Sequence, residues 1–332
     1  MGMARLAWLL LFAVLAVALP ARAEDKIRFG IDWTAEAEYG GYYQAVAAGI
    51  YKKHGLDVTI AQGGPQVNHL QLLIAGRLDF AIISNSLLAL NLVQQAVPYR
   101  AVAAIFQKDP SVLIAHPGAD NDSFEALRGK PIMISSDTRA GWWNFLKAKF
   151  GYTDAQVRPY TFNLQPFLTD SRAIQQGFLG SEPFSIQQAS GQYPVVMLIA
   201  DAGYAGYAGL IGTSDKNIAE RTDLVQRFVD ASIEGWHSYL EGDPAPGNAL
   251  IKQANPEMTD ALLAYGRDSM KKHGIVQSGD AATHGIGAMS SARWQDFYRA
   301  MSQAGLYPPG LDVTKAYTLQ FVNRGLGLSA KP

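Results

Sequence analysis

The fold is decided by residues 27–60, IRFGIDWTAEAEYGGYYQAVAAGIYKKHGLDVTI. Ile27–Ile31 form a short apolar run that is typical of a strand, and Gly41–Tyr51 predict a helix. The sequence His54-Gly55-Leu56 ends this helix, because glycine adopts the left-handed cap conformation and the leucine folds back. Val58–Ile60 form the next strand, so the chain begins with a strand, a helix and a second strand.

The same alternation continues as far as Phe106. Two more strands are predicted at Leu78–Ile83 and Arg100–Phe106, with one helix starting near Pro65 and another over Ser86–Gln95. Helices that separate consecutive strands are typical of a parallel sheet covered on both faces. We therefore predict a four-stranded parallel sheet in this part of the chain.

The pattern then restarts, which indicates a second α/β unit. The predicted strands are Val112–Ala115, Lys130–Ile134, Val157–Phe162 and Val195–Ile199, and the predicted helices are Trp142–Phe150 and Phe167–Gly177. From about Asp215 the chain is almost wholly helical, with helices over Arg221–Tyr239, Thr259–Lys272 and Ser291–Gln303. Two α/β units followed by helices predict a hinged binding protein or a two-domain enzyme, with ligand at the carboxyl ends of the strands.

The first 23 residues have the organisation of a secretory signal peptide. Arg5 supplies the positive charge, Leu6–Leu19 form the apolar core, and Ala21-Arg22-Ala23 is a small-x-small cleavage site before Glu24. The apolar run is shorter than the roughly 20 residues that a membrane-spanning helix needs. We expect cleavage after Ala23 and a soluble, monomeric, periplasmic protein.

Size and charge narrow the classes of function. The 332-residue chain has a formal net charge of −1, and the predicted leader holds two arginines and no acids. The chain without its leader therefore has a formal net charge of −3, which does not suggest a nucleic-acid binder. The remaining length predicts roughly two domains. The chain has no cysteine, so neither a disulfide nor a lipidated cysteine is available.

Four short segments are similar to the solute-binding subunits of ABC importers. They are Asp32-Trp33, Gly40–Ala45, Gly49–Val58 and Ala75–Phe80, and the resemblance covers nearly all of the chain from Ile27 to Val322. More narrowly, the chain resembles the branch that binds pyrimidine precursors of thiamine, to which the alkanesulfonate and taurine binders are related.

This resemblance implies the α/β, two-lobed fold of a type II periplasmic binding protein, with a hinged cleft between the lobes and a helical C-terminal region. In that fold the chain crosses between lobes twice, here near Gln107–Ser111 and Gly203–Gly209. Lobe one is then residues 24–108 and 208–332, and lobe two is residues 109–207. A membrane permease is the implied partner.

Candidate ligand-binding residues stand where strands end, because those loops border the cleft. After the first strand these include Trp33, Glu36, Glu38 and Tyr39, and after the third Ser84, Asn85 and Ser86. Trp33 is either a cleft or a core residue, and Asn85 either faces ligand or caps the next helix. Glycines at the start of the first helix let a ligand approach the backbone closely.

In the second unit, Ser135-Ser136-Asp137-Thr138 follow a strand, and capping explains only one of these four residues. Trp142 and Trp143 point about 100° apart on a helix, so only one of them is expected to line the cleft. By resemblance, Glu182 faces the ligand; the alternative is that it caps a helix starting at Pro183. The full set of expected ligand-binding residues is Trp33, Tyr39, Gly41, Asn85, Gln107, Ser135, Ser136, Trp142, Asn163 and Glu182.

Neither a metal site nor a catalytic site is predicted. The six histidines include no helical i, i+4 pair, the Gly285-Ile286-Gly287 sequence follows no strand, and no Gly-x-Ser-x-Gly motif occurs. No cofactor is expected. The related pyrimidine-synthase enzymes rely on a histidine after the third strand and on a cysteine-rich cluster, which this chain lacks.

The favoured hypothesis is an importer subunit that captures a small planar molecule, with an aminopyrimidine precursor of thiamine as the first choice. Riboflavin or another flat heterocycle is an alternative, because stacking does not discriminate among rings. A sulfonate needs a cation or many free amides, for which Arg139 and Arg158 are available. A sensory module with the same fold is a third class.

Overall fold

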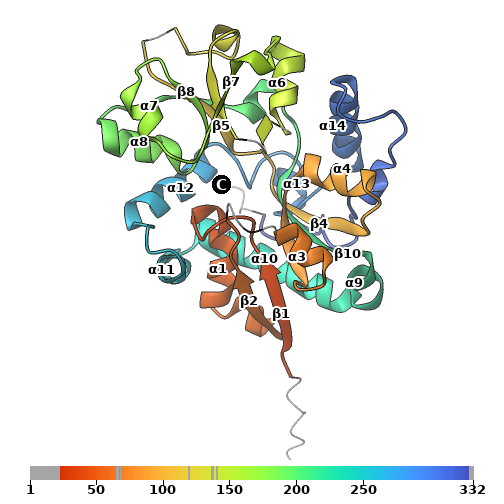
Figure 1. Ribbon diagram of the computed structural model, residues 1–332. Helices are drawn as coiled ribbons and strands as arrows, with labels where there is room; N and C mark the ends of the chain where they lie inside the picture. Colours follow the sequence, from red (N-terminus) through yellow and green to blue (C-terminus); the bar gives the residue numbers. More distant parts are fainter. Residues whose placement is uncertain are drawn as a thin grey trace, which may run out of the picture.

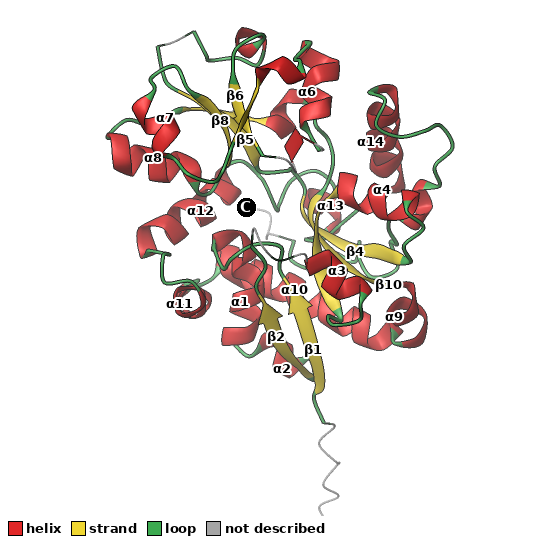
Figure 2. Cartoon of the chain, in the orientation of Figure 1, coloured by secondary structure: helices red, strands yellow, loops and turns green. Residues whose placement is uncertain are grey.

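The computed structural model describes residues 23–64, 67, 69–118, 120–135, 138–139 and 141–328. The predicted signal peptide and Ser136 lie outside the described residues, apart from Ala23. The chain forms two lobes, each built on a five-stranded sheet with helices packed around it (Figures 1 and 2). This confirms the two-lobed α/β fold.

The first sheet has the strand order β2-β1-β3-β10-β4. Its strands are β1 (Asp25–Gly30), β2 (Leu56–Ala61), β3 (Phe80–Asn85), β4 (Tyr99–Phe106) and β10 (Ala208–Ser214). Strand β1 pairs in parallel with β2 and β3, whereas β10 runs antiparallel between β3 and β4. The prediction of a purely parallel four-stranded sheet was wrong, because β10 enters from the other lobe in the opposite direction.

The helices of the first half begin and end close to the predicted positions. They are η1 (Ala37–Tyr39), α1 (Gly40–Ala47), α2 (Ile50–Lys53), α3 (His69–Ile74) and α4 (Ser86–Gln94). The predicted helix over Gly41–Tyr51 is two helices, because the backbone turns into the left-handed region at Gly49, with φ of 68°.

The second sheet has the order β7-β6-β8-β5-β9. Its strands are β5 (Ser111–Ala115), β6 (Ile132–Ile134), β7 (Val157–Pro159), β8 (Ile174–Phe178) and β9 (Val195–Leu198). Its helices are η2 (Glu125–Leu127), α6 (Trp143–Phe150), η3 (Asp154–Gln156), α7 (Gln165–Thr169), α8 (Glu182–Ser190) and η4 (Ile199–Ala202).

The predicted helix over Phe167–Gly177 was wrong in its second half. Helix α7 ends at Thr169, and a turn follows in which the Arg172 amide donates to Asp170 Oδ1 at 2.9 Å. Ile174–Phe178 then form β8, which pairs with β5 on one side and β6 on the other. The apolar residues of this segment have helical spacing, but hydrogen bonding to strands on both sides stabilises it as a strand.

The C-terminal part is mostly helical and packs largely on the first sheet. Its elements are α9 (Asp215–Glu220), α10 (Thr222–Glu241), α11 (Ala245–Ala254), α12 (Asp260–Lys272), α13 (Ala281–His284), α14 (Ser291–Gln303) and η5 (Val313–Lys315). Phe228 of α10 stacks on Phe80 with ring centroids 4.0 Å apart, which anchors this helix in the core. Among the described helices, none combines the length and apolar character that a membrane crossing requires.

Two short segments connect the lobes, residues 107–110 after β4 and residues 203–207 before β10. Arg293 of α14 contacts both. Its guanidinium donates to the carbonyl oxygens of Ala205 and Gly206 at 2.8 and 3.3 Å and to that of Gln107, and it stacks on the Tyr207 ring. One half-buried side chain therefore ties the two connections together.

Candidate ligand-binding cleft

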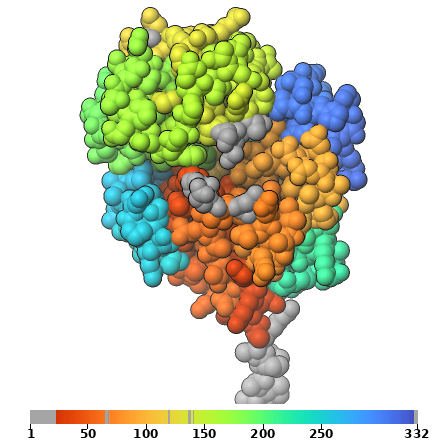
Figure 3. Space-filling model, viewed as in Figure 1, coloured from red at the N-terminus to blue at the C-terminus, as the bar shows by residue number. Residues whose placement is uncertain are grey.

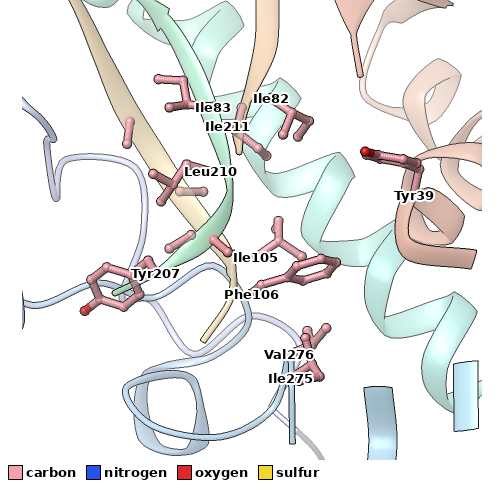
Figure 4. Close-up of a cluster of buried hydrophobic side chains, with 14 of the residues drawn as sticks. Tyr39, Ile82, Ile83, Ile105, Phe106, Tyr207, Leu210, Ile211, Ile275 and Val276 are labelled. Atoms are coloured by element: carbon pink, nitrogen blue, oxygen red, sulfur yellow. The ribbon is translucent and has the colours of Figure 1, made fainter. Parts of the chain in front are cut away.

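A cavity of about 830 Å³ lies between the two lobes and is lined by residues of both. Figure 3 shows the lobes meeting along a seam, with the second lobe in green and yellow above the red and orange of the first. Apolar side chains of the first sheet, among them Ile82, Ile83, Ile105 and Phe106, line the cavity. Figure 4 shows these four residues within a cluster of buried hydrophobic side chains. The site is therefore a cleft above the sheet, roofed by the opposite lobe.

Asp32 follows the first strand and lines the cavity with both carboxylate oxygens already engaged. The Tyr39 hydroxyl donates to Oδ1 at 2.7 Å, and the Ser84 hydroxyl donates to Oδ2. Ser84 lies at the end of β3, which is the neighbour of β1 in the sheet. The loops after two adjacent strands thus fix this carboxylate in one orientation.

Glu38 is the second acidic group at the cavity, and it is held differently. It lies on η1 and is only 4% exposed, yet Oε1 has no hydrogen-bond partner among the described residues. Burial and the Glu182 carboxylate raise the pKa of the Glu38 carboxyl to about 7. Burial, with Glu38, Glu182 and Asp32 nearby, also raises the pKa of Glu36 well above its ordinary value.

Aromatic rings from both lobes meet at the cleft. Trp33 of the first lobe lies 5.1 Å from the Phe162 ring of the second, and Phe162 in turn lies 5.2 Å from Tyr160. Of the two adjacent tryptophans, Trp142 lines the cavity, whereas Trp143 is fully buried and its Nε1 donates to Asp154 Oδ1 at 3.0 Å. These rings provide flat apolar surfaces on both sides of the cleft.

Short polar side chains complete the wall of the second lobe. The Ser135 hydroxyl donates to Thr138 Oγ1 at 3.1 Å and accepts from the Thr138 amide at 3.2 Å, and both residues line the cavity. The Ser135 amide donates to Gln176 Oε1 at 2.6 Å, which anchors this turn to β8. Asn85 lines the cavity and also caps α4, because its Oδ1 accepts from the Leu88 amide at 3.2 Å. Asn85 therefore caps the helix, as one of the two alternatives had it, and also borders the cavity.

Four of the expected ligand-binding residues do not line the cavity, each for a structural reason. Gly41 packs under the Trp236 indole, and a Cβ there would overlap that ring. Gln107 is buried between the lobe connections and the 279–288 loop, where its Nε2 donates to the carbonyls of Ala104 and Ala288. Asn163 is exposed, and its Oδ1 accepts from the Gln165 amide at 2.9 Å.

Glu182 is the fourth. Its Oε2 accepts from the Phe178 amide at 2.8 Å and from the Ser181 hydroxyl at 2.7 Å, so this carboxylate stabilises the start of α8. Its Oε1 accepts from the Tyr160 hydroxyl at 3.3 Å, and Tyr160 does line the cavity. Glu182 thus contacts a lining residue but does not itself line the cavity.

Several lining residues were not among the expected ones. They include Asp32, Asp109, Tyr160 and Phe162, whereas Glu38 was among the candidates named after the first strand. Asp32 and Tyr160 come directly after strands, so the rule used for their neighbours also applies to them. Asp109 lies in the first lobe connection, and the pKa of its carboxyl is raised by burial. Phe162 lies beyond the end of β7 at φ of 60°, and no sequence signal identifies it.

Carboxyls dominate the ionisable groups of the cavity, whose lining also includes His69, with Nε2 2.8 Å from the Ile82 carbonyl oxygen. Asp32, Glu38 and Asp109 line the cavity, whereas its described lining includes neither arginine nor lysine. Arg139 lies 3.7 Å from Asp154, and Arg158 donates to the carbonyls of Ala155 and Val157, so neither supplies the cation that a sulfonate needs. No group of three or more potential metal ligands occurs in the described part of the chain.

A model of the family described as NMT1/THI5 like matches residues 36–245. Riboflavin-binding protein RibY from Chloroflexus aurantiacus is 24% identical over 309 residues, which cover 91% of this chain and 87% of RibY. Among solved structures, the aliphatic sulphonate binding protein SsuA from Escherichia coli superimposes with a TM-score of 0.67 at 10% identity, covering 89% of this chain and 92% of SsuA. The SsuA from Xanthomonas axonopodis, bound to MOPS, gives 0.65 at 13% identity, covering 90% and 99%. These structural matches confirm the periplasmic-binding-protein fold.

Proposed function

This chain belongs to the NMT1/THI5-like family, and from that premise we propose that it is the substrate-binding subunit of an ABC importer in the periplasm. Its ligand is a small planar heterocycle that carries amino groups, and it is delivered to a membrane permease. The observation that carries the proposal is a cleft lined by rings from both lobes and by carboxyls, with neither arginine nor lysine in its described lining.

The size and shape of the cleft support a small-molecule ligand. Its volume of about 830 Å³ lies within the range of roughly 300–1,000 Å³ for small-molecule sites. Trp33 of the first lobe and Trp142 of the second both line it, so a flat ring bound there contacts aromatic surfaces of both lobes. Such a ligand favours the closed arrangement, because contacts to both lobes form only when the lobes meet.

The carboxyls of the cleft support an amino-substituted ligand. Asp32 is fixed by Tyr39 and Ser84, and Oε1 of Glu38 is buried without a donor among the described residues, so the cavity offers an unmatched acceptor. Exocyclic amines and protonated ring nitrogens are matching donors. An aminopyrimidine precursor of thiamine satisfies both the rings and the carboxyls, whereas an anionic sulfonate meets like charge. We therefore rank the sulfonates last.

Riboflavin is the second candidate. The similarity to RibY extends over 91% of this chain, and the apolar lining of the cleft suits a larger flat ring system. An enzyme of the pyrimidine-synthase kind is disfavoured, because the chain has no cysteine and the third strand ends in Ser84 and Asn85 without a histidine. A sensory binding subunit uses the same cleft and differs only in its membrane partner.

Native mass spectrometry of the exported protein, purified without denaturation, tests the proposal. We expect a one-to-one complex that releases a small amine-bearing heterocycle on activation, and loss of that cargo in Trp142→Ala. Visible flavin absorbance in the purified protein favours the second candidate instead. A sulfonate, phosphate or other oxyanion as the released cargo contradicts the proposal.

A further inference from the structure

One oxygen of the Glu38 carboxyl, Oε1, is buried at the cleft without a hydrogen-bond partner among the described residues. Only 4% of the residue is exposed, and it lines the cavity. Buried polar groups in folded proteins nearly always have hydrogen-bond partners, because a group that loses its bound water without gaining a hydrogen bond destabilises the protein. The donor that Glu38 lacks must therefore come from a proton or from a ligand.

The second lobe meets the first directly at this carboxyl. Gly180, in the turn between β8 and α8, lies so close that a Cβ there would overlap Glu38 Oε1. Gly266 of α12 flanks the same point: a Cβ there would be 2.8 Å from the Ala37 side chain and 3.2 Å from the Gly180 carbonyl oxygen. The two glycines thus leave room for the carboxyl at a point where the two lobes meet.

The ionisable groups around Glu38 leave it short of positive charge. Glu36 and Asp32 lie in its own segment, and Glu182 faces it from α8. Tyr239 of α10 and Tyr265 of α12 carry hydroxyls whose pKa values are raised first by burial and also by Glu38.

One cation lies on an adjoining helix, and it is already engaged. Arg267 of α12 donates through Nε to the Tyr239 carbonyl at 2.8 Å and through Nη2 to the Leu240 carbonyl at 2.6 Å. The described lining of the cavity adds neither an arginine nor a lysine. Every neighbouring charge that faces Glu38 is therefore negative.

We propose that Glu38 is the subsite that receives a cationic nitrogen group of the ligand, an amidinium or a protonated amine, and that this charge holds the two lobes together. The inference rests on the proposed function and deepens it by fixing the charge of the ligand. A charge-assisted hydrogen bond to a buried carboxylate is about twice as strong as a neutral one. The cation replaces the proton that Glu38 otherwise carries near neutral pH, so binding releases a proton.

Benzamidine and benzamide test this subsite whatever the natural ligand is. They have nearly the same planar shape, but benzamidine is a cation and benzamide is neutral. Titrations followed by NMR compare the wild-type protein with Glu38→Gln and with the control Glu220→Gln, which changes an exposed acid of α9. We expect wild type and control to prefer benzamidine at least tenfold at about pH 8 and less at about pH 6, and Glu38→Gln to lose that preference.

Glu38→Asp keeps the charge but shortens the side chain, so we expect a preference for benzamidine between those of wild type and Glu38→Gln. Thermal melts establish that each variant is folded. Equal affinity of wild-type protein for the two probes, or no measurable binding of benzamidine at millimolar concentration, overturns the assignment. A benzamidine preference without binding of any aminopyrimidine leaves the subsite intact and refutes the proposed ligand. Aminopyrimidine binding that Glu38→Gln leaves unchanged supports the proposed ligand and refutes the assignment of Glu38 as its subsite.

Discussion

The two walls of the cleft differ in chemistry. The first lobe contributes two carboxyls, Asp32 and Glu38, to the lining, whereas the described lining residues of the second lobe from Ser111 to Phe178 are aromatic, small or hydroxyl-bearing and carry no charge. A positive charge on a ligand would thus meet the carboxyls of the first lobe and that of Asp109 in the first lobe connection, and a flat ring would lie largely against the second lobe. A ligand that has both features gains its full binding energy only when the lobes meet, which couples recognition to closure.

The adjacent tryptophans of the second lobe offer the sharpest contrast between its core and its cleft wall. Trp143→Ala removes a fully buried indole and its bond to Asp154, so we expect a loss of about 3–5 kcal/mol in the free energy of unfolding. Trp142→Ala removes an indole that faces the cavity, so we expect a smaller loss of stability and about 1–3 kcal/mol of binding energy.

Urea unfolding of the ligand-free variants and ligand titration of both measure these two effects separately. Equal losses of affinity in Trp142→Ala and Trp143→Ala contradict the assignment of one ring to the cleft and the other to the core.

The acidic wall predicts an unusual pH dependence of stability. Glu38 ionises near its ordinary pKa of 4.5 in the unfolded chain but at about 7 when folded. Its neutral form therefore contributes stability fully below pH 4.5, and this contribution is lost as the pH rises to about 7. Glu38→Gln removes that loss, so the ligand-free variant at about pH 8 is expected to be more stable than wild type by up to about 3 kcal/mol.

Thermal melts of the ligand-free proteins across this pH range provide the measurement, with Glu220→Gln as the matched control. A Glu38→Gln variant that is less stable than wild type at high pH, or equally stable at every pH, shows that the carboxyl has a donor in the folded protein.

The contact between the walls is tested by Gly180→Ala. Because the added methyl overlaps Glu38 Oε1, we expect a destabilisation of about 1–3 kcal/mol and a ligand affinity about tenfold weaker. In a Glu38→Ala background the same change has room, so we expect almost no additional destabilisation there. A double-mutant cycle of unfolding free energies measures this coupling. Additive effects of the two substitutions contradict contact between the lobes at this point.

The smallest expected effect is at the mouth of the cleft. Phe162 is 49% exposed, lies at φ of 60°, and its ring contacts Trp33 across the lobes. Phe162→Ala removes an aromatic contact of about 0.5–1.5 kcal/mol, so we expect faster ligand release with little change in stability. Stopped-flow dissociation measures the rate. A slower release in this variant shows that the ring obstructs the entrance rather than closing it.

Much of the fold is predictable from the sequence because it depends on local periodicity. The strands of the first half and the helix Ser291–Gln303 follow from spacing and end signals. Strand β10 and the β8 segment do not, since each owes its conformation to distant partners on both sides. The segment Ala208–Ser214 contains two glycines and has a weak strand signal of its own. Its pairing with β3 and β4 makes it a strand.

Part of the site is predictable from the sequence by the rule that residues just after strands border the cleft. Five of the expected residues, Trp33, Tyr39, Asn85, Ser135 and Trp142, border the cavity, and all but Trp142 were expected from this rule. The rule misplaces Gln107 and Asn163, because a residue in a lobe connection or a loop has no fixed direction until its hydrogen bonds form. The unmet carboxyl of Glu38 has no signal in the sequence, since it arises where η1, α12 and the β8–α8 turn converge.

The most direct test of the account is calorimetric titration of the wild-type protein, near neutral pH, with the hydroxymethyl aminopyrimidine precursor of thiamine and with taurine. We expect one-to-one binding of the aminopyrimidine and no detectable heat from taurine, because the described lining of the cavity holds carboxyls but neither arginine nor lysine. Tight binding of taurine together with no binding of the aminopyrimidine would contradict it.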